Sequence, residues 1–274
     1  MTVPSSFGPP GPLAVTPNGT LYVASGSELY KMSGSRLEPF ARASTAIGSA
    51  VAVANGTIYL GEATRLQAVS ESGAVTTVAR VQVGGMGLGP KGVLYVVIGN
   101  DIEQLVDQRF AVVATAAQFK GLPGVPVGGL GLGSVTADGA GDLYISASGI
   151  GFNLYELTKS GRARYISGFR GANGKTAPLS VGPHGVVYGE WQNAIYQADG
   201  GGISLYLDFT ARTVSDIGGT FLPAFIAAPA TTGSPLYAVA DGENGWSADS
   251  AIVAIYPGHR VTTLWRSASK QQVL

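Results

Sequence analysis

The 274-residue sequence contains no cysteine and only two histidines. Without cysteine, the chain can form no disulfide scaffold, thiolate zinc site or thiol nucleophile. Charged residues make up 12% of the chain, against roughly 25% in ordinary soluble domains. Lys and Arg number 17, as do Asp and Glu, so the charge balance does not indicate a nucleic-acid-binding face. Apolar runs are far shorter than the roughly 18–20 residues of a membrane helix, so we expect no membrane insertion.

The first residues of the sequence lack the features of a secretory signal. Residues Met1–Pro12 have no basic segment followed by an apolar one, and four prolines interrupt them. Two interpretations of the compartment stay open. The protein is cytoplasmic if Met1 is the native start, and extracytoplasmic if the chain is an excised domain.

A short phrase recurs along the chain: a turn containing Gly, followed by apolar residues around a Tyr. Examples are NGTLYVAS at Asn18–Ser25 and GDLYISAS at Gly141–Ser148. The tyrosines that mark the phrase are Tyr22, Tyr59, Tyr95, Tyr144, Tyr188 and Tyr237. Their separations of 36 to 49 residues bracket the roughly 40–45 residues of a four-stranded propeller blade.

Each repeat divides into four short strands, and the first repeat shows the plan. It predicts strands at Leu13–Val15, Leu21–Ala24, Glu28–Met32 and Leu37–Ala41. Asn-Gly pairs such as Asn18-Gly19 are strong hairpin signals, because Gly reaches positive φ without steric cost. We therefore predict an all-β, six-bladed β-propeller in one domain over residues 1–274. Its blades fall at approximately 12–46, 47–82, 83–128, 129–174, 175–220 and 221–268. A β-sandwich with the same number of strands is the alternative.

These phrases resemble the NHL-repeat six-bladed propellers, within a wider group that includes gluconolactonase-like and strictosidine-synthase-like propellers. The resemblance is at the level of the fold, and runs from about Leu13 to Arg266. It implies a docking surface for a ligand or protein or, in some branches, a metal-dependent hydrolase. It also implies a pocket at the mouth of the central channel, on the face formed by the second-to-third and fourth-to-first strand connections.

A Gly/Pro-rich insertion, AQFKGLPGVPVGGLGLG, occupies residues 117–133. Two interpretations are open for this segment. It is either a long surface loop, which we favour, or a lid over one end of the ring.

Both histidines fall in tight turns on the face opposite the expected pocket. His184 lies in Gly182–Gly185 and His259 in Tyr256–His259. This placement argues against a His general base, a Ser–His–Asp arrangement and a His-rich metal site.

The second-to-third strand connections carry acidic, amide and indole side chains in a chain that has few acids. We predict that these residues converge on the channel rim and bind a ligand. The predicted ligand-binding residues are Glu62, Asn100, Asp101, Asn153, Glu190, Trp191, Asn193, Asp241, Glu243, Asn244 and Trp246. Trp beside carboxylates suits a sugar or a cationic ligand.

Three functions are compatible with this rim. The first is a non-catalytic, sensor-type recognition propeller for a small molecule, glycan or protein. The second is a metal-assisted hydrolase or lactonase in which Glu62, Glu190 and Asp241 hold Ca²⁺ or Mg²⁺. The third is acid/base chemistry by Glu190, the candidate catalytic residue, without a metal. For the first function we expect no cofactor, no nucleic-acid partner and a monomeric protein. Glu62 paired with Arg65 is the simpler structural alternative for that acid.

Overall fold

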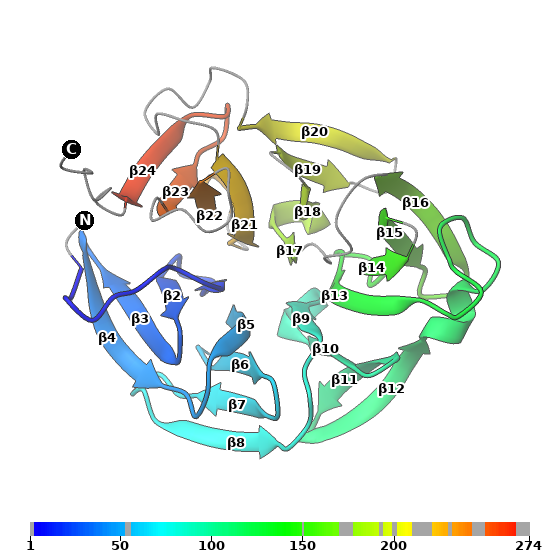
Figure 1. The fold of residues 1–274 in the computed structure, drawn as a ribbon, viewed down its shortest axis with the longest axis horizontal. Coiled ribbons are helices and arrows are strands. Elements are labelled where there is room, and N and C mark those ends of the chain that lie inside the picture. Colours follow the sequence, from blue (N-terminus) through cyan, green and yellow to red (C-terminus); the bar gives the residue numbers. More distant parts are fainter. Residues whose placement is uncertain are drawn as a thin grey trace, which may run out of the picture.

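The computed structural model describes residues 3–52, 56–149, 151–169, 178–191, 194–198, 202–209, 221–229, 232–242 and 250–266. Over these residues the strands form six four-stranded antiparallel sheets arranged as a ring, with the first strand of each sheet nearest the centre (Figure 1). The predicted six-bladed β-propeller is therefore confirmed. Three short 3-10 helices are the helical elements of the described ranges, and none of these is long and apolar enough to cross a membrane.

Each blade is one contiguous stretch of chain, and the strands run in order from the centre outward. Blades 1 to 3 contain β1 (Leu13–Val15), β2 (Leu21–Ser25), β3 (Glu28–Ser33), β4 (Arg36–Arg42), β5 (Ile47–Ala52), β6 (Ile58–Glu62), β7 (Leu66–Val69), β8 (Val75–Ala79), β9 (Gly85–Leu88), β10 (Leu94–Ile98), β11 (Asp101–Val106) and β12 (Arg109–Thr115). Blades 4 to 6 contain β13 (Gly131–Ala137), β14 (Leu143–Gly149), β15 (Gly151–Leu157), β16 (Ala163–Phe169), β17 (Leu179–Val181), β18 (Val187–Trp191), β19 (Ala194–Ala198), β20 (Ile203–Asp208), β21 (Phe221–Ala227), β22 (Leu236–Gly242), β23 (Ser250–Ile255) and β24 (Val261–Arg266). The helices are η1 (Pro90–Gly92), η2 (Ala116–Phe119) and η3 (Pro183–Gly185).

The repeated tyrosines occupy the same place in every blade. Each lies on the second strand, opposite one residue of the innermost strand. The six pairs are Ala14 with Tyr22, Val51 with Tyr59, Gly87 with Tyr95, Thr136 with Tyr144, Ser180 with Tyr188 and Ala227 with Tyr237. Burial raises the pKa of all six phenols above the ordinary value of a tyrosine. The tyrosine that marks each sequence repeat is thus part of the internal packing of its blade.

A β-bulge recurs between the third and fourth strands of every blade. It follows Leu29, Leu66, Ile102, Leu154, Ile195 and Ile252 on the third strands. The extra residue on the fourth strand is Phe40, Val78, Val113, Ile166, Tyr206 or Leu264. In blade 1 this residue packs on the repeated tyrosine, with the Phe40 and Tyr22 ring centroids 5.1 Å apart. Bulges increase the local twist of a strand, so the same irregularity shapes the outermost strand of all six blades.

Phe7 closes the ring between the first and last blades. Its ring makes edge-on contacts with Tyr30 of β3, at 5.0 Å between centroids, and with Trp265 of β24, at 5.1 Å. The Gly8 amide donates to Ser25 Oγ at 3.0 Å and fixes the segment that carries Phe7. Because blade 6 already has its four strands, this segment joins blades through side chains rather than as an exchanged strand.

Candidate functional site

The strand directions divide the connections between two faces of the ring. Successive strands are antiparallel, so connections from second to third strands and from fourth to first strands lie on one face, which we call the mouth face. The opposite face is the turn face. The three longest connections between strands, residues 116–130, 170–178 and 209–220, all join strand ends on the mouth face. The three widest sequence intervals between described strands therefore begin and end on one side of the ring.

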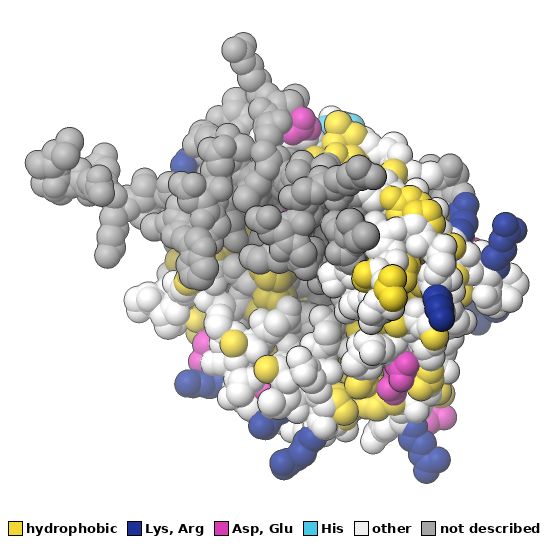
Figure 2. Space-filling model, turned by 45° about the vertical axis from the view of Figure 1, so that its right-hand side comes forward, with side chains coloured by type: hydrophobic (Ala, Val, Ile, Leu, Met, Phe, Trp, Pro, Cys, Tyr) yellow, Lys and Arg dark blue, Asp and Glu magenta, His cyan; other side chains and the backbone are white. Residues whose placement is uncertain are grey.

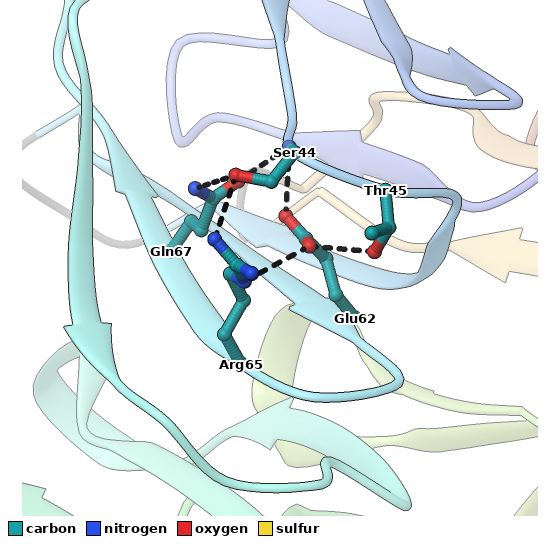
Figure 3. A network of polar contacts seen from close by, with 5 residues as sticks. All are labelled: Ser44, Thr45, Glu62, Arg65 and Gln67. Atoms are coloured by element: carbon teal, nitrogen blue, oxygen red, sulfur yellow. Dashed lines mark hydrogen bonds and ion pairs between the residues drawn. The ribbon is translucent and has the colours of Figure 1, made fainter.

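Glu62 is the best-defined predicted rim residue, and it is buried at 2% exposure. It ends β6 on the mouth face, where Oε1 accepts the Ser44 amide at 3.2 Å and Oε2 accepts the Thr45 hydroxyl at 2.6 Å (Figure 3). Gln67 of β7 completes the network by donating to Ser44 Oγ at 2.9 Å. The carboxylate therefore ties the connection between blades 1 and 2 to the centre of blade 2.

Arg65 joins the same network from the β6–β7 connection (Figure 3). Its Nη1 donates to Ser44 Oγ at 3.1 Å, and its Nε lies 3.7 Å from Glu62 Oε2. That Nε is buried and has no hydrogen-bond acceptor. The alternative in which Glu62 pairs with Arg65 is thus realised, as an ion pair without a hydrogen bond.

Asn153 is also buried, at 2% exposure, near the start of β15. Beside it lies the segment 116–130, which we call the strap. A Cβ atom on Gly124 of the strap would overlap the Asn153 side chain. Phe119 is fully buried against Tyr155, with ring centroids 5.4 Å apart, and the Tyr155 hydroxyl donates to the Pro123 carbonyl at 2.9 Å. These contacts hold the strap on blade 4.

The strap runs along the outer edge of the ring, with η2 between the outer strands β12 and β16, and does not cross the centre (Figure 1). This position agrees with the surface-loop interpretation of the Gly/Pro-rich insertion. Asn153 lies beneath the strap, so the strap covers that part of the rim in blade 4.

The remaining predicted rim residues are placed to different extents. Asn100 is exposed between β10 and β11, and Asp101 is half-buried at the start of β11. The negative charge of Asp101 adds to burial in raising the pKa of the Glu103 carboxyl. Glu190 is half-buried near the end of β18, where it already has an interaction partner. The described Asp, Glu and His residues include no group of three that could hold a metal ion.

Trp191 and Asp241 are placed by their backbone alone. Trp191 is the last residue of β18, and Asp241 precedes the last residue of β22, so both stand at strand ends on the mouth face. Asn193, Glu243, Asn244 and Trp246 lie outside the described residues. The topology thus brings the strand ends of blades 2 to 6 that carry the predicted residues to one face.

The histidines lie on the turn face, and both are exposed. His184 in η3 lies 3.3 Å from the Thr232 hydroxyl, and the His259 ring packs edge-on against Tyr206 at 4.9 Å. Each contact joins blade 5 to blade 6. Charged side chains on the described surface in Figure 2 stand apart from one another and do not gather into one patch of a single sign.

Sequence reasoning missed Ser44, Thr45 and Gln67 as partners of Glu62. Ser44 and Thr45 leave the fourth strand of blade 1, whereas Glu62 and Gln67 belong to blade 2. The available signal was the pair of hydroxyl residues at a fourth-to-first connection next to an acid at a second-strand end. Only the assembled ring makes that pair adjacent.

Comparisons with known proteins extend the fold assignment. No protein-family model matches the chain, and no curated protein matches it. Among solved structures, regucalcin from Agrobacterium tumefaciens, described as a calcium-binding protein, is 13% identical, with 96% of this chain and 90% of that chain covered and a TM-score of 0.62. A gluconolactonase from Xanthomonas campestris is 11% identical over 79% of this chain and 73% of its own, with a TM-score of 0.54.

A third similar structure is the extracellular domain of a proposed one-component system from B. thetaiotaomicron. It is 12% identical, with 87% of this chain and 38% of that chain covered, and the TM-score is 0.55. At such low identity these likenesses show a shared propeller fold and carry no assignment of chemistry.

Proposed function

We propose that this protein is a non-catalytic recognition propeller that binds a small molecule, glycan or protein on its mouth face. The observation that carries the proposal is the unequal distribution of the connections: the three longest join strand ends on the mouth face. Binding residues concentrate on loops held by a rigid scaffold, and six packed sheets form such a scaffold. The likeness to an extracellular domain of a proposed one-component system supports a sensor-type role.

The chemistry proposed for this face is stacking combined with polar recognition. Trp191 stands at the mouth-face end of β18, directly after Glu190. An indole supplies apolar contact area to a sugar ring, and carboxylates from the neighbouring connections accept hydrogen bonds from its hydroxyl groups. The predicted residues Asn193, Glu243, Asn244 and Trp246 follow the second strands of blades 5 and 6, and with Asp241 near the end of β22 they extend this proposed surface.

A metal-assisted hydrolase is the second candidate, and the likeness to a gluconolactonase and a calcium-binding propeller favours considering it. It requires Glu62, Glu190 and Asp241 to hold a divalent cation. Both Glu62 oxygens already accept hydrogen bonds from Ser44 and Thr45, and Arg65 adds a positive charge 3.7 Å away. This arrangement does not fit a metal ligand, so we derive no reaction step through a metal.

A paired binding and turnover experiment tests the proposal. The protein is applied to a glycan array and assayed for hydrolysis of D-glucono-δ-lactone with Ca²⁺, Mn²⁺ or EDTA. Recognition without catalysis predicts array binding that Trp191→Ala weakens and no cation-dependent turnover. Tyr256→Ala, on the turn face, is the matched aromatic control and leaves array binding unchanged. Cation-dependent turnover abolished by EDTA would establish the hydrolase instead, and binding insensitive to Trp191→Ala would place recognition elsewhere.

A further inference from the structure

The guanidinium group of Arg65 lies at the mouth face with part of its hydrogen-bonding capacity unused. Its bond to Ser44 Oγ is at the surface, its Nε has no acceptor, and its Nη2 makes no hydrogen bond with a described residue. The side chain is 32% exposed. A guanidinium carries five N–H donors in one plane, so donors remain for a group that arrives from solvent.

The positive charge of Arg65 is only loosely compensated. Its ion pair with Glu62 is 3.7 Å long, because the carboxylate oxygens are directed to Ser44 and Thr45. Arg164 on β16 provides the contrast, since its Nε hydrogen-bonds directly to Glu156 at 2.5 Å. The positive charge of Arg65 can therefore still attract a second anionic group.

The position of Arg65 is fixed before any ligand binds. Ser44, which accepts the Nη1 hydrogen bond, is itself held by the Gln67 amide at 2.9 Å and by the Glu62 carboxylate at 3.2 Å. Two connections on the same face, β4–β5 and β6–β7, thus determine where the guanidinium lies (Figure 3). A side chain ordered in advance loses less conformational entropy on binding than a free one.

We propose that Arg65 binds the carboxylate of an acidic sugar, a uronic acid, at the mouth face. This inference rests on the proposed recognition function and names its ligand class. The carboxylate accepts hydrogen bonds from the Nη1 and Nη2 end of the guanidinium, a charge-assisted and planar arrangement. The sugar ring extends from there across the mouth face. Glu62 acts as a positioning residue that orients Arg65 and does not contact the ligand.

Saturation-transfer NMR with D-glucuronate and D-glucose tests the charge requirement, because the two sugars share a ring and differ in the carboxylate. The wild-type protein is expected to bind glucuronate at least about tenfold more tightly than glucose. Arg65→Gln removes that preference, and Arg65→Lys retains part of it because the charge persists without the planar fork. Arg42→Gln, at the end of β4 on the same face, is the matched control and leaves the preference intact.

The outcomes separate this inference from the proposed function. Equal binding of glucose and glucuronate that survives Arg65→Gln would overturn the role of Arg65 and leave mouth-face recognition in place. Absence of binding by either sugar would overturn the assigned ligand class, while the array result decides the recognition function independently. Circular dichroism melting of each variant verifies that Arg65→Gln is folded. If Arg65→Gln does not fold, the sugar preference of Arg65→Lys tests the role of Arg65 instead.

Discussion

Gly87 of β9 packs against the backbone of Val135 in β13, so closely that a Cβ atom on Gly87 would overlap the Val135 carbonyl oxygen. Gly85, two residues earlier, has the same relation to Gly133. The innermost strands of blades 3 and 4 therefore approach each other backbone to backbone. Neither glycine has a positive φ, so the requirement for glycine at both positions is one of space.

Substituting Gly87 with Ala should destabilise the protein by about 2–4 kcal/mol, because the added methyl group forces two inner strands apart. Urea denaturation measures this loss. Gly128→Ala is the control, since no atom lies within 4 Å of its Cβ position and its φ is not positive. It should change the free energy of unfolding by less than about 0.5 kcal/mol. Equal stabilities of the two variants would contradict the close packing of β9 on β13.

Replacing Glu62 with Ala should cost about 2–4 kcal/mol of stability, because the Ser44 amide and the Thr45 hydroxyl lose a buried, charged acceptor. Chemical denaturation measures the effect. Glu38→Ala, an exposed position on β4, is the matched control and should be nearly neutral. If Glu62→Ala were equally neutral, the carboxylate would have no role in holding the connection between blades 1 and 2.

Phe7→Ala should lower the free energy of unfolding by about 2–3 kcal/mol, because Tyr30 and Trp265 lose the ring that packs between them. Phe7→Leu, which retains apolar volume without the aromatic edge contacts, should fall between Ala and the wild type. Thermal denaturation gives the order, and Trp265 fluorescence should shift to longer wavelength as the ring becomes hydrated. A Phe7→Ala protein with unchanged stability and emission would show that the ring closes without this contact.

Phe119→Ala should make the strap sensitive to trypsin at Lys120. In the folded protein Phe119 is fully buried, and the Lys120 and Leu122 amides donate to the carbonyls of Ala117 and Phe119. Losing the buried ring frees the segment to adopt the extended form that a protease requires. Mass spectrometry of the fragments identifies the cut. Val127→Ala, at a fully exposed strap position, should remain as resistant as the wild type.

Stability should fall as the pH rises from about 10 to about 12. Burial, reinforced by Glu156, raises the pKa of Tyr144 to about 12, and burial raises that of Tyr155 to about 12. Unfolded tyrosines ionise near pH 10, so above that pH the unfolded state is stabilised by losing protons that the folded state retains, and the free energy of unfolding falls. Below pH 10 this contribution is fully present. Tyr144→Phe should flatten the decline, and absorbance near 295 nm follows the phenolates.

The sequence predicted the strands of the first blade closely, because each one is set by local signals. The Asn18-Gly19 hairpin and the apolar run around Tyr22 fix β1 and β2, and β1 has the predicted bounds Leu13–Val15. The recurring bulges escaped prediction, since nothing in the sequence of a fourth strand marks which residue is left unpaired. Phe40 is recognisable as such only when its contact with Tyr22 is seen.

The candidate site was predictable only as a set of strand ends on one face. The participation of Glu62 in a buried network depends on Thr45, which lies 17 residues away in the sequence and belongs to a different blade connection. Likewise, the covering of Asn153 depends on the strap that follows blade 3. Such contacts arise from the packing of one blade on the next, so they cannot be predicted from the sequence pattern within a single repeat.

Among the described residues, blades 1 and 6 each take their four strands from their own stretch of chain, so no strand pairing between described strands crosses the seam where the ring is completed. Each sheet gathers its partners from nearby sequence, so during synthesis the sheets can form in order as the chain emerges, and the seam must form last. Resistance to opening there depends on side-chain packing, in which Phe7 and Trp265 lie against an apolar cluster that unites Leu13, Val15 and Val23 of blade 1 with Ala227, Val239 and Ile252 of blade 6.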